Sequence, residues 1–211
     1  MRTPFFVLTL LVSFTLLLGC SNKVVNLGDT ELRLVNREIS STDKQEQRIA
    51  LSNRQGDGLA ILDGVDFKTG TIEVDLKGEN TPGRSFVGVA FNVQNDSTYE
   101  AIYFRPFNFR AEEKARREHA VQYISHPKHN WRFLRTNYEG QYEAEYDRQP
   151  AADEWFTVRI AVADDTVTVY DQATNSELLA VERLAEPASN KMGLWMGNNS
   201  KGAFKHLRIS K

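Results

Sequence analysis

The chain has 211 residues, of which 41% are hydrophobic and 26% charged, and its formal net charge is -2. This composition is typical of a globular protein with one sizeable core, and it excludes a disordered, a collagen-like or a polytopic membrane chain. A small negative charge provides no basic field, so we expect no nucleic-acid partner.

The first twenty residues predict an export signal. Arg2 precedes an almost wholly apolar stretch from Phe5 to Leu18. This stretch is shorter than the roughly 17–25 residues of a membrane-spanning helix and is typical of the apolar region of a secretory signal peptide. It ends in Leu17-Leu18-Gly19-Cys20, and Cys20 is the only cysteine of the chain.

A small residue followed by cysteine at this place resembles the lipobox of bacterial lipoproteins. The resemblance implies that residues 1–19 are removed and that Cys20 is lipidated, which would make the lipid bilayer a partner. Serine at position 21 then implies the bacterial cell envelope, with the protein on the outer membrane facing the periplasm or the exterior. The alternative is an ordinary signal peptide with an incidental cysteine.

We expect a short tether at residues 20–26 and one domain at residues 27–211. Alternation of apolar and polar residues predicts many short strands, separated by turn sequences such as Asp63-Gly64 and Pro82-Gly83. The clearest strands are residues 71–76, 86–93, 99–105, 156–162, 166–170, 192–196 and 204–209. This pattern predicts an all-β, two-sheet antiparallel jelly-roll sandwich. Only the charged stretch Ala111 to His119 indicates a short helix or turn.

Several of these segments resemble concanavalin A-like (laminin G-like) jelly rolls. The segments that carry the resemblance are residues 58–62 and 70–75, residues 155–160 and 167–170, and the closing segments Gly193-Leu194-Trp195 and 204–209. Within this superfamily the chain is most similar to the bacterial 3-keto-disaccharide hydrolase-like domains, which implies a role in glycoside metabolism. The superfamily also contains lectins, laminin modules and glycosidases, so the fold alone does not define the function.

Two carboxylates on one predicted strand are candidate catalytic residues. Glu73, Asp75 and Glu79 resemble the Glu-x-Asp-x-Glu or Glu-x-Asp-x-x-Glu motif of family-16 glycosidases, whose retaining chemistry needs two carboxyls about 5–5.5 Å apart. Here three residues separate Asp75 from Glu79, so the pattern departs from the motif at the acid/base position. The alternative is that Glu73 and Asp75 are polar residues on the solvated face of a strand.

A second set of residues is suited to binding a sugar. Tyr103 and Arg105 alternate with the apolar Ile102 and Phe104 and therefore point away from the core. A phenol that stacks and polar groups that donate hydrogen bonds fit the apolar faces and polar rim of a sugar. The full set of expected ligand-binding residues is Tyr103, Arg105, Asn108, Gln122, Trp131 and Trp195. The alternative is that these side chains only cover a strand or fill the core.

His126 is a candidate general base, because a histidine titrates near neutral pH, although it could equally be a histidine in a polar loop. We expect no metal, since His126 and His129 have helical spacing but Pro127 lies between them and no carboxylate joins them. No glycine-rich phosphate loop is present, so we expect no nucleotide cofactor.

Three functions remain open at this point. The first is a carbohydrate-binding lipoprotein of the envelope, and the second is a glycoside-acting hydrolase similar to the 3-keto-disaccharide hydrolases. The third is a protein-interaction module of the envelope. Convergence of Glu73, Arg105, Gln122 and His126 in one cleft would favour the enzyme, whereas a shallow aromatic face would favour binding. In either case we expect a ligand on the concave face of a sheet; the oligomeric state is left open.

Overall fold

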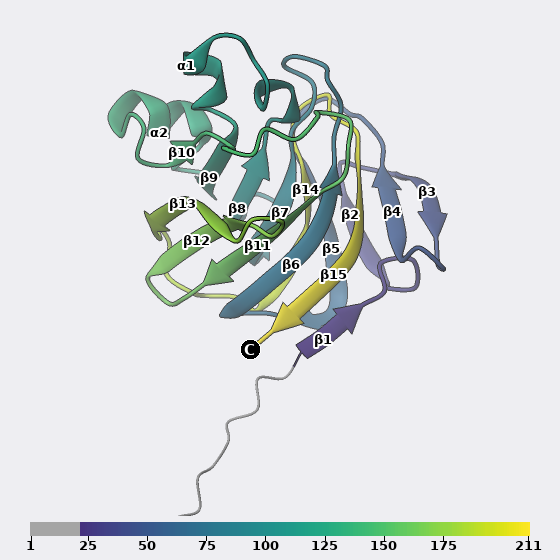
Figure 1. Ribbon diagram of the computed structural model, residues 1–211. Helices are drawn as coiled ribbons and strands as arrows, with labels where there is room; N and C mark the ends of the chain where they lie inside the picture. Colours follow the sequence, from purple (N-terminus) through teal and green to yellow (C-terminus); the bar gives the residue numbers. More distant parts are fainter. Residues whose placement is uncertain (1–21) are drawn as a thin grey trace, which may run out of the picture.

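The computed structural model describes residues 22–211, which form two antiparallel β-sheets that lie face to face (Figure 1). The expected all-β jelly-roll sandwich is confirmed. The predicted signal peptide and the lipidation site Cys20 lie outside the described residues. Within residues 22–211, no helix has the length and apolar character that a membrane crossing requires.

Sheet A has the strand order β13 (Ser176–Glu182), β12 (Thr166–Asp171), β11 (Phe156–Val162), β6 (Gly70–Lys77), β15 (Gly202–Ser210), β4 (Arg48–Leu51) and β3 (Ile39–Asp43), and β1 (Asn22–Val25) also pairs with β15. Sheet B has the order β10 (Glu143–Ala144), β9 (Val121–His126), β8 (Thr98–Phe104), β7 (Val87–Asn95), β14 (Lys191–Met196), β5 (Gly58–Asp66) and β2 (Leu32–Val35). The closing strand β15 therefore lies in the middle of its sheet.

Alternation along the strands determines which side chains enter the core between the sheets. On β6, Ile72, Val74 and Leu76 are fully buried, while the residues between them face outward from sheet A. The same outer face carries Trp155, whose ring lies 4.8 Å from the ammonium group of Lys205. Each sheet thus has one face in the core and one outer face.

The N-terminal boundary of the domain differs from the prediction. Residues 22–25 were expected to belong to a tether, but they form β1, with Asn22 opposite Ser210 and Val25 opposite Leu207. Val25 is buried, and its burial explains why this short segment pairs with β15 rather than leaving the sandwich. The described part of the expected tether is therefore largely a strand of sheet A.

Three short helical segments lie at one end of sheet B (Figure 1): η1 (Pro106–Asn108), α1 (Lys114–Arg117) and α2 (Trp131–Asn137). The helix α1 falls inside the charged stretch where a helix was expected. The helix α2 was not predicted, because only Leu134 of its seven residues is buried and no apolar period marks it.

A buried ion pair closes the opposite edge of the core. Glu100 of β8 accepts hydrogen bonds from Arg183, from the Tyr123 hydroxyl (2.6 Å) and from the Asn92 amide (2.7 Å). The side chains of Glu100 and Arg183 are 0% and 1% exposed. Because Arg183 directly follows β13, this network fixes the connection between the two sheets.

Replacing Glu100 with glutamine is expected to lower the free energy of unfolding by about 3–5 kcal/mol, because buried Arg183 would lose the carboxylate that compensates its charge. Urea denaturation measures the difference. Glu73→Gln is the control, since its partner Arg208 has a side chain 56% exposed, and its cost should stay below about 1 kcal/mol. Equal losses in the two variants would contradict this prediction.

Candidate functional site

A cleft of about 420 Å³ opens on the outer face of sheet B. Its floor comes from β8, β9 and β14, and its walls come from α1, α2 and the loops before β5, before β7 and after β14. We call it the sheet B cleft. Its volume lies within the range of small-molecule binding sites.

Two aromatic rings in contact with each other form the floor of the sheet B cleft. The rings of Tyr103 and Trp195 lie 4.6 Å apart, although their strands β8 and β14 are separated by β7. The residue of β7 in register with both is Gly88, where a Cβ atom would lie 2.2 Å from the carbonyl oxygen of Ile102. Because Gly88 has no side chain, the rings of Tyr103 and Trp195 can contact each other across β7.

Two loops and the end of β9 supply a first polar group at one side of the sheet B cleft, made of Asp57, Asn198 and His126. The Asn198 side-chain oxygen accepts a hydrogen bond from the Gly56 amide (2.7 Å), which joins the loop before β5 to the loop after β14. The imidazole Nε2 of His126 lies 4.0 Å from an Asp57 carboxylate oxygen, and its ring stacks on Tyr99 at 5.1 Å.

Burial controls the charge of this first group. It raises the pKa of Asp57, an effect that the neighbouring His126 and Arg37 oppose. It also lowers the pKa of His126, against the attraction of Asp57. His126 is therefore a neutral imidazole at pH 7, able to donate one hydrogen bond and accept another.

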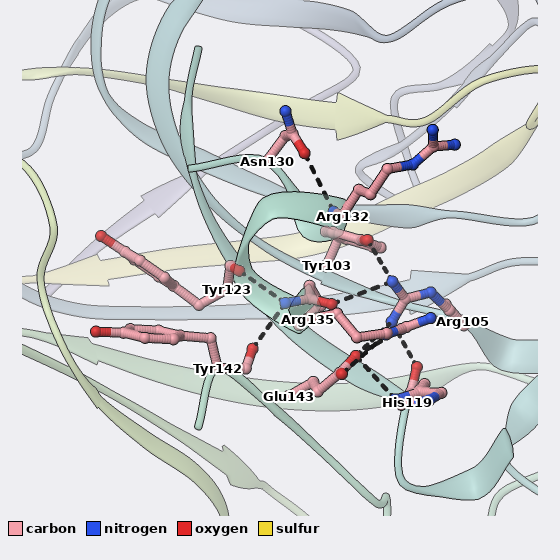
Figure 2. A network of polar contacts seen from close by, with 10 residues as sticks. Tyr103, Arg105, His119, Tyr123, Asn130, Arg132, Arg135, Tyr142 and Glu143 are labelled. Carbon is pink, nitrogen blue, oxygen red and sulfur yellow. Dashed lines mark hydrogen bonds and ion pairs between the residues drawn. The ribbon is translucent and has the colours of Figure 1, made fainter. Parts of the chain in front are cut away.

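A second polar group surrounds the buried carboxylate of Glu143 on β10 (Figure 2). Arg135 of α2 binds this carboxylate with two hydrogen bonds of 2.9 and 2.6 Å. The Nδ1 atom of His119 lies 2.9 Å from Glu143, and the Nη1 atom of Arg105 lies 3.9 Å from it. We call Glu143, Arg135, His119 and Arg105 the Glu143 cluster.

Arg105 is held mainly by neutral groups. Its guanidinium donates hydrogen bonds to the Tyr103 hydroxyl (2.6 Å), the Gln122 side-chain oxygen (3.1 Å) and the His119 carbonyl (2.6 Å), as Figure 2 shows. The Arg105 side chain is only 6% exposed, and burial lowers its pKa. This arrangement keeps a charged group at a fixed position in the wall of the cleft.

Helix α2 places two residues of the sheet B cleft on one side of the helix. The side chain of Asn130 caps the helix by accepting hydrogen bonds from the backbone amides of Arg132 and Phe133 (Figure 2 shows the first). Trp131 and Arg135 are one turn apart, and the Arg135 guanidinium carbon lies 5.3 Å from the Trp131 ring centre. Trp131 is 40% exposed, so its ring is available at the rim of the cleft.

The sheet B cleft brings together many of the residues that the sequence singled out. Tyr103, Arg105, Asn108, His126, Trp131 and Trp195 all line it. Gln122 does not, because its side chain is fully buried, accepts a hydrogen bond from Arg105 and donates one to the Tyr142 carbonyl (2.9 Å). Gln122 therefore positions Arg105 rather than facing the cleft.

The expectation that Glu73 and Asp75 share this cleft is wrong. Both residues lie on β6, on the outer face of sheet A, on the other side of the sandwich. Glu73 accepts a hydrogen bond from Arg208 (2.6 Å), and Asp75 contacts Thr157 (2.7 Å) and His206 (2.8 Å). Alternation correctly places them away from the core, but it does not reveal to which sheet their strand belongs.

Other residues of the sheet B cleft were not singled out as ligand contacts. Asp57 and Asn198 lie on two different loops, which meet because Gly58 pairs with Met196. His119 ends the charged stretch where a helix was expected, and Arg135 lies on the helix α2, which was not predicted. In residues 22–211, no three histidine, cysteine, aspartate or glutamate side chains are grouped so as to hold a metal ion.

No protein-family model and no curated protein matches the sequence. Among solved structures, the chain is similar to the carbohydrate-binding module CBM66 from Bacillus subtilis, with a TM-score of 0.61 and 13% identity over 85% of this chain and 96% of that one. It is also similar to the exoplasmic/lumenal domain of VIP36 bound to Ca²⁺ and Man3GlcNAc (TM-score 0.55, 11% identity, 85% and 83% covered). A third is a β-1,3-1,4-glucanase (lichenase) derived from a mouse hindgut metagenome (TM-score 0.55, 10% identity, 91% and 98% covered). At these identities the likeness shows a shared jelly-roll fold.

The stability of the protein is expected to fall as the pH is lowered from 7.5 to 5.5. Burial lowers the pKa values of His119, His126 and His129 in the folded state. The unfolded chain therefore takes up more protons as the pH falls through about 6.5, the ordinary histidine value, and folding loses free energy. The raised pKa of Asp57 acts in the opposite sense at lower pH, so the test stays above pH 5.5.

Urea denaturation at pH 7.5 and 5.5 measures this loss. A variant with His119→Gln and His126→Gln should lose less stability between the two pH values than the wild type, because two of the three partly buried imidazoles with a lowered pKa are gone. A free energy of unfolding that rises toward pH 5.5 in the wild type would show that these histidines do not govern the pH dependence.

Proposed function

We propose that this jelly-roll domain binds carbohydrate in the sheet B cleft. The observation that carries the proposal is a cleft with the exposed ring of Trp131 at its rim, the paired rings of Tyr103 and Trp195 in its floor, and hydrogen-bonding side chains in its walls. Sugars present apolar ring faces and a rim of hydroxyl groups, which is the pattern that this floor and these walls complement. The three similar structures support a sugar as the kind of partner, since one is a carbohydrate-binding module and one holds Man3GlcNAc.

An unsatisfied amide in the wall adds to this support. Asn108 lines the cleft and is only 5% exposed, and its Oδ1 atom is buried without a hydrogen-bond partner. A buried acceptor without a donor costs about 1–3 kcal/mol, which a ligand hydroxyl would recover by donating to it. Neutral His126 offers a further donor and acceptor in the same cleft.

Binding is favoured over glycoside hydrolysis by the carboxylates of the cleft. Retaining or inverting hydrolysis with a pair of carboxyl groups needs two of them on either side of the scissile bond. Among the described residues that line the sheet B cleft, Asp57 is the only aspartate or glutamate. The expected pair, Glu73 and Asp75, lies on the other sheet, so the alternative of a hydrolase similar to the 3-keto-disaccharide hydrolases has lost its predicted carboxylates and keeps only the candidate base His126 in the cleft.

We also propose that the domain is a lipoprotein of the bacterial envelope, anchored through Cys20. The lipobox-like sequence Leu17-Leu18-Gly19-Cys20 supports this part of the proposal. Two or three acyl chains, at about 0.8 kcal/mol for each buried CH₂ group, would give an essentially permanent anchor. Because β1 begins at Asn22, the sandwich would sit close to the bilayer.

A glycan array that contains neutral and acidic polysaccharide fragments tests the binding function, followed by calorimetry on each fragment bound. Trp131→Ala is expected to weaken binding at least tenfold, about 1.4 kcal/mol, because it removes the exposed ring at the rim. Tyr138→Ala is the matched control: Tyr138 is 37% exposed beside the same helix but does not line the cleft. Absence of any bound glycan, or equal affinity of Trp131→Ala and wild type, would refute the proposal. The bound fragments are also assayed for hydrolysis.

Replacing Cys20 with alanine tests the anchor. In a Gram-negative host, the wild-type protein is expected in the membrane fraction with incorporated radiolabelled palmitate, and Cys20→Ala is expected to lose both, because no thiol remains to be acylated. A Cys20→Ala variant that still carries the label would rule out this residue as the lipidation site.

A further inference from the structure

We infer that the ligand of the sheet B cleft is an acidic saccharide, whose carboxylate or sulfate group binds between Arg105, Arg116 and Arg135. This inference rests on the proposed carbohydrate-binding function and adds the chemical class of the ligand. It follows from the charge balance of the cleft, from the burial of Arg105 and from the position of Arg116.

The charges that line the sheet B cleft do not cancel. Three guanidinium groups line it, those of Arg105, Arg116 and Arg135, against one carboxylate, that of Asp57. Asp57 belongs to the other polar group, beside His126. The carboxylate nearest to Arg105 and Arg135 is Glu143, and Arg135 already occupies both of its oxygens. One negative charge therefore serves two arginines of the Glu143 cluster.

This imbalance leaves the positive charge of Arg105 without full compensation. Its side chain is 6% exposed, its three hydrogen-bond acceptors are neutral oxygens, and its distance to the shared Glu143 carboxylate is 3.9 Å. A buried charge that lacks full compensation is costly, unless an ion of opposite sign comes close to it. A negatively charged ligand in the cleft would supply the missing charge.

Arg116 extends the positive region toward the solvent. It lies on α1, its side chain is 44% exposed, and it pairs with the exposed Glu113 at 3.4 Å. Such an exposed pair is weak, so the guanidinium can exchange Glu113 for a ligand at little cost. The planar fork of a guanidinium matches the paired oxygens of a carboxylate or a sulfate.

The other features of the cleft indicate that the anion is part of a sugar. The buried Oδ1 atom of Asn108 needs a donor, and an anionic group alone has none to offer, whereas a sugar hydroxyl has one. The exposed ring of Trp131 at the rim provides a surface for a sugar face that a small inorganic anion would not cover. An acidic saccharide uses both sets of groups at once.

The experiment compares charged saccharides with their neutral counterparts. The probes are oligogalacturonate, alginate and hyaluronan fragments with their carboxyl-reduced forms, and κ-carrageenan fragments with their desulfated forms. Calorimetry is expected to show at least one charged probe that binds tenfold or more tightly than its neutral form. Its affinity should fall between 50 and 300 mM NaCl, because salt screens the attraction. The carboxylate and sulfate arms identify which anion is recognised.

Variants of α1 locate the charge that matters. Arg116→Gln is expected to weaken the best charged probe at least fivefold and to reduce the ratio of its affinity to that of the neutral form, while Arg116→Lys keeps most of the affinity. Lys114→Gln is the matched control: it removes the same charge from the same helix, but Lys114 does not line the cleft, and no change is expected.

Two results would overturn the inference. One is that neutral forms bind as tightly as charged ones, and the other is that Arg116→Gln and Lys114→Gln behave alike. If neutral glycans bind and charge has no effect, carbohydrate binding stands and only the acidic class is wrong. If neither the probes nor the glycan array shows binding, the proposed function fails together with this inference.

Discussion

The carboxylate of Glu143 organises one whole side of the cleft. It lies on β10, a two-residue strand at the edge of sheet B, yet its side chain is only 3% exposed. Arg135 attaches α2 to it, and His119 brings the segment after α1 against it. Because α2 also carries Trp131, the position of an exposed aromatic ring depends on a buried charge that it does not itself touch. The polar and apolar parts of the cleft are therefore held in place by the same carboxylate.

Two buried ion pairs elsewhere in the sandwich clarify what is unusual about Arg105. Arg183 meets Glu100 with both side chains inaccessible, and Asp171, fully buried, accepts hydrogen bonds from Arg148 and the Tyr146 hydroxyl. In both places a carboxylate and an arginine are matched one to one, so the network is complete without a ligand. Among residues 22–211, only Glu143 serves two guanidinium groups, those of Arg105 and Arg135. Arg37 is also buried, but backbone carbonyl oxygens hold it, so what distinguishes Arg105 is its shared carboxylate together with its position in the wall of the cleft.

Local alternation was enough to predict which residues of each strand leave the core, and for this reason Tyr103 and Trp195 were assigned to an outer face correctly. It was not enough to predict which outer face, because the sheet of each strand depends on pairings between residues far apart in the chain. Glu73 illustrates the limit: its strand pairs with β11 and β15 rather than with β8. Gln122 illustrates another, since a buried amide is recognisable only once the arginine that it supports is in place.

The positions of the three tryptophans allow occupancy of the cleft to be followed by fluorescence. Trp195 forms part of the cleft floor and Trp131 stands at its rim, whereas Trp155 lies on the outer face of sheet A beneath Lys205. Two indoles are therefore next to a bound molecule, and the third is separated from it by the whole thickness of the sandwich. Intrinsic fluorescence can follow occupancy of the cleft without any label, and the emission of Trp155 supplies a constant internal reference in the same chain.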